Sequence, residues 1–155
     1  MAINVFTNRT TGKSNDQASP GQIADISGLK IEPCSDLRGA NLIGANLESA
    51  DLSGANLSNA RMQNARLRNA NLKGANLKGA ILVNADLRGA DLTGANMIRG
   101  IDLTEANLIG ANLTDADLRY AILNRANFAG ANLEGANLTN AYMTGTTMPN
   151  GSIHK

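Results

Sequence analysis

The chain has 155 residues, of which only 3% are aromatic, and a formal net charge of +1. This length fits one domain that buries a core without disulfides, but so few aromatic residues are unlike an ordinary globular core. Ala, Asn, Leu and Gly dominate instead, which indicates a repeat. A net charge so close to zero argues against strong electrostatic recruitment to DNA or acidic membranes, and equally against a polyanion mimic.

The N-terminal residues lead us to expect no secretory signal. Met1 to Phe6 lack the basic flank and apolar stretch of a secretory signal. No segment approaches the roughly 18 apolar residues that cross a membrane. We therefore expect a cytoplasmic protein without membrane contact. Residues 1–23 are polar and contain the breaker pair Pro20-Gly21, so we expect a flexible or capping segment there.

From residue 24 to residue 155 the chain follows a period of five. A large apolar residue recurs at every fifth position, a small one lies two residues before it, and Asn or Asp lies between, as in Ala45-Asn46-Leu47-Glu48-Ser49. This period belongs neither to a helix nor to a plain strand. Because residues two apart in an extended piece point the same way, Ala and Leu should face inward and Asn outward. The last two residues turn the chain, and the second is mostly Gly or Asn, which tolerate positive φ.

Two positions interrupt this period. Cys34 is one residue too many before Ser35, and Gly100 makes the interval from Met97 to Leu103 six residues. Gly100 is predicted to form a bulge, after which the phase resumes. Cys34 is the only cysteine, so no internal disulfide can form. Its apolar neighbourhood predicts a buried small side chain that reacts slowly with thiol reagents.

The tandem units resemble the pentapeptide-repeat family. The resemblance implies an all-β fold, a right-handed quadrilateral β-helix with four units per coil. The repeat would then form about six to seven coils, continuous across Gly100. Ile101 and Thr146 depart from Ala at the small inward position, so a slight widening of the rod is expected at both.

The sequence contains no recognisable catalytic motif. The only histidine is His154, next to the last residue, and no metal-ligand spacing, phosphate-binding loop or nucleophile motif occurs. Aspartates such as Asp86 and Asp117 occupy the outward position interchangeably with Asn. We expect no catalytic residue, no metal and no cofactor.

Nucleic-acid binding is also not expected. The basic stretch from Arg61 to Arg88 would be distributed over all four sides of the rod, with Glu48 over Arg68 and Arg66 over Asp86. Such exposed pairs dilute a basic face, and no aromatic stacking platform accompanies the charge. Family members that modulate DNA gyrase by mimicking DNA are acidic rods with a C-terminal dimerisation module. The net charge of +1 disfavours that alternative.

Two surfaces are candidates for binding. Four units per coil would stack several apolar outward residues on one side, namely Ile43, Ile81, Val83, Ile122 and Tyr142. This side is predicted to bind an unidentified protein or a second copy of the chain. The other candidate is the irregular-coil surface of Arg99, Gly100, Glu105, Tyr120 and Arg125, where an Arg99–Tyr120 contact and a Glu105–Arg125 ion pair are available. The favoured interpretation is that these contacts stabilise the coil that Gly100 disturbs, which we call local stitching. The alternative interpretation is a binding site.

The sequence thus predicts a non-enzymatic structural or binding scaffold that acts through protein–protein contacts. Its resemblance to the plain Ala-(Asn/Asp)-Leu-X-X proteins of photosynthetic bacteria predicts the cytosol of such a bacterium as its location.

Overall fold

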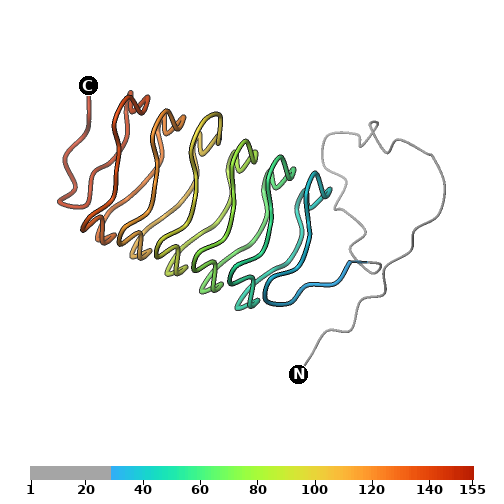
Figure 1. Cartoon of the computed structure of the whole chain (residues 1–155). Helices are drawn as coiled ribbons and strands as arrows, with labels where there is room; N and C mark the ends of the chain where they lie inside the picture. Colours follow the sequence, from blue (N-terminus) through green and yellow to red (C-terminus); the bar gives the residue numbers. More distant parts are fainter. Residues whose placement is uncertain (1–28) are drawn as a thin grey trace.

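The computed structural model describes residues 29–155. Over these residues the chain winds into a rod of stacked four-sided coils, and the order of coils along the rod follows the sequence (Figure 1). The described part contains no α-helix and no strand longer than one residue; its coils pair through isolated β-bridges. The predicted right-handed quadrilateral β-helix is confirmed. The predicted segment 1–23 and the start of the repeat lie outside the described residues.

The bridge pattern sets the size of each coil. Asn41 pairs in parallel with Arg61, and Arg61 with Ile81, an offset of 20 residues (61 − 41 = 20). Ile81 then pairs with Asp102, an offset of 21. The offset returns to 20 where Asp102 pairs with Ile122. The corner at Gly100 therefore absorbs one extra residue, and the rod continues across it as predicted.

Backbone hydrogen bonds link every coil to the next. The Leu42 N–H donates to the Arg61 carbonyl at 2.7 Å, and the Arg61 N–H donates to the Ala40 carbonyl at 2.9 Å. At the corner, the Gly44 N–H donates to the Gln63 carbonyl at 2.8 Å. Backbone polar groups thus find partners without long strands, and successive coils are held in fixed register.

The interior is a column of large side chains beside small ones. Leu87 and Ala85 are each 1% exposed, and full burial of a leucine contributes about 1.5–3 kcal/mol. The small alanines let the walls close around the leucines. Ile101 and Thr146, which replace Ala at the small position, are both fully buried. The Thr146 hydroxyl donates to the Leu123 carbonyl at 2.7 Å, so its polarity is satisfied.

The outward Asn or Asp and the corner residue shape each turn together. Asn76 Oδ1, for example, accepts the Lys78 N–H at 3.2 Å, the local bond that favours Asn and Asp in turns. The second turn residue has positive φ at every corner from Cys34 to Gly145, as at Gly44 (φ 64°) and Asn59 (φ 57°). Five corners after the middle of the rod hold side chains that rarely adopt this conformation: Arg99, Glu105, Asp115, Tyr120 and Arg125.

Cys34 differs from the prediction. Its φ is 60° and its N–H donates to the Ser53 carbonyl at 2.8 Å, the bond that Gly39 makes to Ser58. Cys34 therefore occupies a regular corner, one coil before Gly54, and is not an extra residue. The predicted burial is wrong because a corner side chain points away from the rod, and the thiol is exposed.

This exposure reverses the expected reactivity of Cys34. We expect a small maleimide to label the folded protein at a rate within about three-fold of the rate in denaturant, because an accessible thiol needs no opening of the fold. Mass spectrometry over a time course measures both rates, and Cys34→Ser is the unlabelled control. Labelling that is slow until denaturant is added would contradict the exposed corner.

The last coil has a neighbour on one side only. Leu133, Leu138 and Met143 are partly buried there, unlike their counterparts in the middle of the rod. The chain then folds back, so that Thr147 pairs antiparallel with Ile153 and the His154 N–H donates to the Thr146 carbonyl at 2.8 Å. Residues 29–155 form no helix of the length and hydrophobicity that a membrane crossing requires.

Candidate interaction surfaces

One side of the rod gathers the predicted apolar residues. Its bridge residues stack in a single column, and we call this side the Ile81 side: Asn41, Arg61, Ile81, Asp102, Ile122 and Tyr142. The same register stacks Ile43 and Val83 in a parallel column two residues along. Ile43, Ile81, Val83 and Ile122 are half-buried, and Tyr142 is 63% exposed. The structure thus brings all five predicted residues onto one side.

The two columns of the Ile81 side carry one positive and one negative charge. Arg61 and Asp102 lie one coil below and one coil above Ile81. Asp102 Oδ1 accepts the Thr104 hydroxyl at 2.6 Å and the Thr104 N–H at 2.9 Å. Within residues 29–155, Arg61 and Asp102 take part in no ion pair. Both charges are therefore available to a partner.

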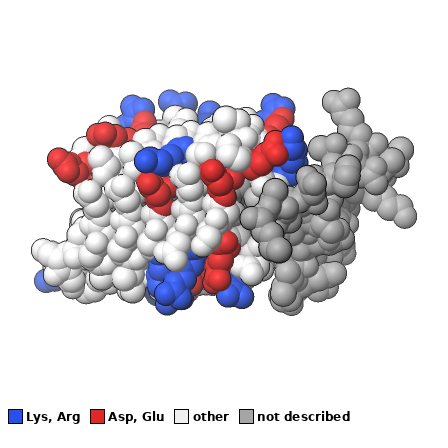
Figure 2. All heavy atoms as spheres, turned by 90° about the horizontal axis from the view of Figure 1, so that it is seen from below, with Lys and Arg blue, Asp and Glu red and all other residues white. Residues whose placement is uncertain are grey.

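The other sides carry more charges, and several of these charges are paired. Arg66 binds Glu48 at 2.7 Å and Arg88 binds Asp86 at 2.6 Å. The bridge of Arg66 with Asp86 confirms the predicted register, but the predicted partners are wrong, because the long Arg66 side chain reaches diagonally to Glu48 while Asp86 binds within its own unit. Figure 2 shows charges of both signs interspersed on one face of the rod.

The paired aspartates are held ionised. The hydrogen bond from Arg88 lowers the pKa of Asp86 below its usual value, despite the opposing effect of burial. The hydrogen bond from Arg119 lowers the pKa of Asp117 in the same way. A general acid at neutral pH needs a raised carboxyl pKa, so these carboxylates are suited to neutralising arginines.

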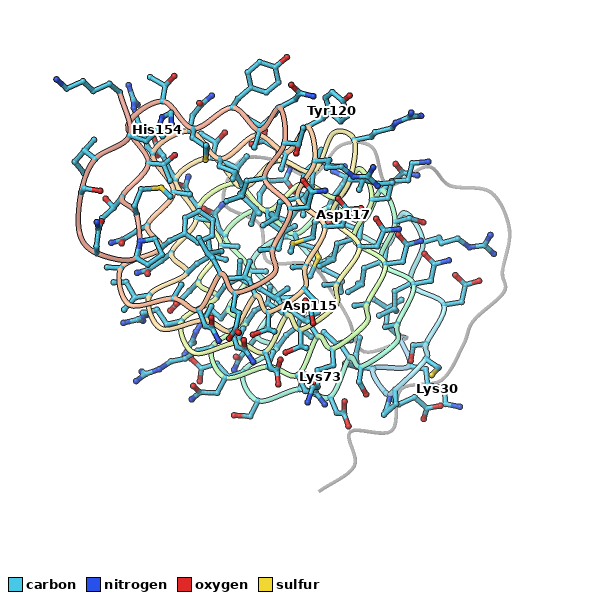
Figure 3. All side chains as sticks on the ribbon, turned by 60° about the vertical axis from the view of Figure 1, so that its left-hand side comes forward. Lys30, Lys73, Asp115, Asp117, Tyr120 and His154 are labelled. Atoms are coloured by element: carbon cyan, nitrogen blue, oxygen red, sulfur yellow. The ribbon has the colours of Figure 1, made fainter. Side chains whose placement is uncertain are left out.

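Part of the irregular-coil surface forms a shallow hollow. Ile98, Arg99, Arg119 and Tyr120 line a space of about 180 Å³. Tyr120 is 48% exposed and projects from the wall of the rod (Figure 3). Arg119, which the sequence did not single out, is held at 2.7 Å by Asp117.

The corner after Gly100 contains the predicted ion pair. Arg125 Nη1 lies 3.1 Å from Glu105 Oε1, one coil away. Gly100 itself has φ 87°, in the region that glycine enters without strain. The local stitching that the sequence predicted for this coil is therefore present in part. In the described part of the chain, no group of three or more His, Cys, Asp or Glu side chains could hold a metal ion.

The chain is similar in sequence and fold to known repeat proteins. The family model of pentapeptide repeats matches the chain in 8 copies, over residues 35–74, 70–108, 98–132 and 111–150. No curated protein matches the chain significantly. Among solved structures, alr5209, a pentapeptide repeat protein from Nostoc PCC 7120, is 50% identical over 49% of this chain and 62% of that one, with a TM-score of 0.48. This chain therefore spans less than two thirds of alr5209.

Two further structures come from cyanobacteria. HetL, a protein from Nostoc sp. strain PCC 7120 involved in heterocyst differentiation regulation, is 36% identical over 78% of this chain and 67% of its own, with a TM-score of 0.32. Rfr23 from Cyanothece 51142 is 31% identical over 78% of this chain and 90% of its own, with a TM-score of 0.37. Both are pentapeptide repeat proteins. The family model covers residues 35–150, most of the chain, and shows that the chain belongs to the pentapeptide-repeat family.

Proposed function

We propose that this protein is a non-enzymatic binding scaffold and that the Ile81 side is its docking surface. The observation that carries the proposal is the stack of apolar groups on a side with few charges. Apolar centres ringed by polar groups are typical of protein interfaces. The other sides carry more charged groups, which hold water at the surface and make desolvation by a partner more costly.

The construction of the rod suits such a role. Each outward residue is fixed by backbone hydrogen bonds. Arg61 is bonded to Ala40 and Leu42 of the preceding coil, and its chain neighbours Ala60 and Met62 are bonded to Ile81 of the following coil. The apolar groups are therefore presented at a fixed spacing of about 4.8 Å per coil. A surface prepared in this way needs little ordering when a partner binds, which lowers the entropic cost of association.

Placing two lysines on this side tests the proposal. In the paired variant Ile81→Lys and Ile122→Lys, we expect partner proteins captured from the native extract to be lost by at least about ten-fold, because two ammonium groups would be desolvated in the interface. The inward Leu and Ala residues are untouched, so the circular dichroism spectrum and melting temperature should stay close to those of the parent protein. Quantitative mass spectrometry of the captured proteins measures the loss.

The matched control makes the same exchange on two other sides. Ile98 is half-buried and Ile109 is 41% exposed, and neither belongs to the Ile81 side. Ile98→Lys with Ile109→Lys should leave the captured partners in place. If the control loses them equally, or if the Ile81 side variant keeps them all while folded, this side is not the docking surface.

A further inference from the structure

The charges of the Ile81 side are arranged so that the side is complementary to itself. The column reads Arg61, Ile81, Asp102 in three successive coils, with a positive and a negative group at equal distances from a central apolar one. Two coils separate the charges by about 10 Å along the rod, too far for direct contact within one chain. We propose that a second copy of this chain docks on the Ile81 side in antiparallel orientation, about a two-fold axis that passes by Ile81.

Rotation about that axis keeps each column opposite itself and reverses the order of the coils. Arg61 then faces Asp102 of the second copy, Asp102 faces its Arg61, and the two Ile81 side chains meet in the centre. Val83 meets its equivalent in the second column by the same operation. Each contact occurs twice, as in any isologous interface.

The same charges disfavour the other arrangements. A parallel pair with its two-fold axis along the first column would place Arg61 against Arg61 and Asp102 against Asp102, and like charges in contact are repulsive. A parallel pair with its axis between the two columns would set Arg61 against Gln63 and Asp102 against Thr104, and would leave both charges unpaired. An antiparallel pair centred on Asp102 would bring the two Asp102 carboxylates together. The axis at Ile81 is the one that pairs both charges and buries an apolar centre.

An unsatisfied polar atom also lies on this side. Gln63 lies in the second column between Ile43 and Val83, and its buried Oε1 has no hydrogen-bond partner within residues 29–155. Buried acceptors without partners are costly and uncommon. In the proposed dimer Gln63 faces Thr104 of the second copy, whose hydroxyl proton is already donated to Asp102. The Gln63 amide would therefore donate its N–H to that hydroxyl oxygen, and the proposal does not rest on a partner for Oε1.

The size of the surface sets the strength of the dimer. The overlap runs from the Asn41 coil to the Ile122 coil, about 20 Å along one side of the rod. Such a stripe is much smaller than the surface of about 800 Å² that each partner buries in a standard interface. We therefore expect a weak, reversible dimer that weakens further as salt screens the paired charges.

This inference rests on the proposed docking role of the Ile81 side, and exchanging its charges tests it. Sedimentation equilibrium of the intact chain, from about 10 µM to 1 mM, should show mass rising toward the dimer. Arg61→Glu alone and Asp102→Arg alone should each raise the dissociation constant by at least about ten-fold, because each creates two like-charge contacts. The double variant restores opposite charges and should return it to within about three-fold of the parent value. Arg68→Glu, the same change on another side, is the control and should have little effect.

A cross-link checks the position of the axis. In a Cys34→Ser background, Ile81→Cys should be joined to its own equivalent by a short bismaleimide, while Ile109→Cys should not. A monomer at every concentration, single variants without effect, or a double variant that fails to restore the dimer would overturn the proposal. If the chain is monomeric yet the paired lysine variant still loses a captured protein, self-association fails and the docking role of the side survives.

Discussion

Truncating Leu87 to alanine should lower the free energy of unfolding by about 3 kcal/mol, within the range of about 2–5 kcal/mol known for buried leucines. Leu87 is 1% exposed in the middle of the rod, and the register stacks it between Leu67 and Leu108. The shortened side chain would leave a cavity between two coils that backbone hydrogen bonds hold at fixed spacing. Those bonds prevent the coils from closing over it. Urea unfolding followed by circular dichroism measures the loss.

The matched control is the same truncation at the end of the rod. Leu138 is only partly buried, so Leu138→Ala removes less surface from contact and leaves no closed cavity. We expect about half the loss seen at Leu87, or less. Equal losses at the two positions would mean that the last coil is covered in solution and that stacking inside the rod is not what makes Leu87 costly.

The sequence was sufficient to predict the parts of the structure that repeat. A period of five with small and large inward residues defines the unit, and the resemblance to a known family supplied the four sides. Once both are given, every outward residue has a column, which is why Ile81, Ile122 and Tyr142 could be placed on one side in advance. The same arithmetic placed Gly100 as an insertion that shifts the register by one residue.

Side-chain partners within this frame could not be predicted from spacing. The offset of 20 residues puts Arg66 next to Asp86, yet Arg66 binds Glu48 and Asp86 binds Arg88. Which carboxylate an arginine reaches depends on its rotamer and length, and neither is contained in a period. The unpaired oxygen of Gln63 could not be predicted for the same reason, because whether an amide oxygen finds a hydrogen-bond donor depends on how its neighbours are placed.

The prediction for Cys34 was wrong for a different reason. In a regular unit a large apolar residue lies two positions before the second turn residue. Cys34 is the second turn residue of its unit, but the residue two positions before it is Glu32. Counting from Ile31 therefore gave a phase that was wrong by one residue and made Cys34 look like an insertion. The backbone conformation, with φ 60° and the bond to Ser53, reveals the phase that side-chain identity conceals.

The insertion at Gly100 is directly followed by the large residue Ile101, and we expect the two to compensate for each other. Arg99 and Gly100 are consecutive residues with positive φ, which occurs nowhere else in residues 29–155. Ile101 stands in the column of Ala80 and Ala121 and is fully buried. The extra residue thus gives the chain room to place a branched side chain where the neighbouring coils hold alanine.

Deleting Gly100 alone should therefore destabilise the rod by about 1–3 kcal/mol, because Ile101 would be forced into a space sized for alanine. Ile101→Ala alone should cost about 2–5 kcal/mol, because the widened coil would then enclose a cavity. The two changes together restore a regular unit with an offset of 20 residues, so their combined cost should fall below the sum by at least about 1 kcal/mol. Denaturant unfolding of the four proteins gives this coupling energy directly.

Deletion of Gly110, at a regular corner, is the control. It breaks the period with nothing to compensate, and it should be far more damaging than deletion of Gly100. Additive costs at Gly100 and Ile101 would contradict the prediction, because they would show that the inserted residue and the large residue do not compensate for each other.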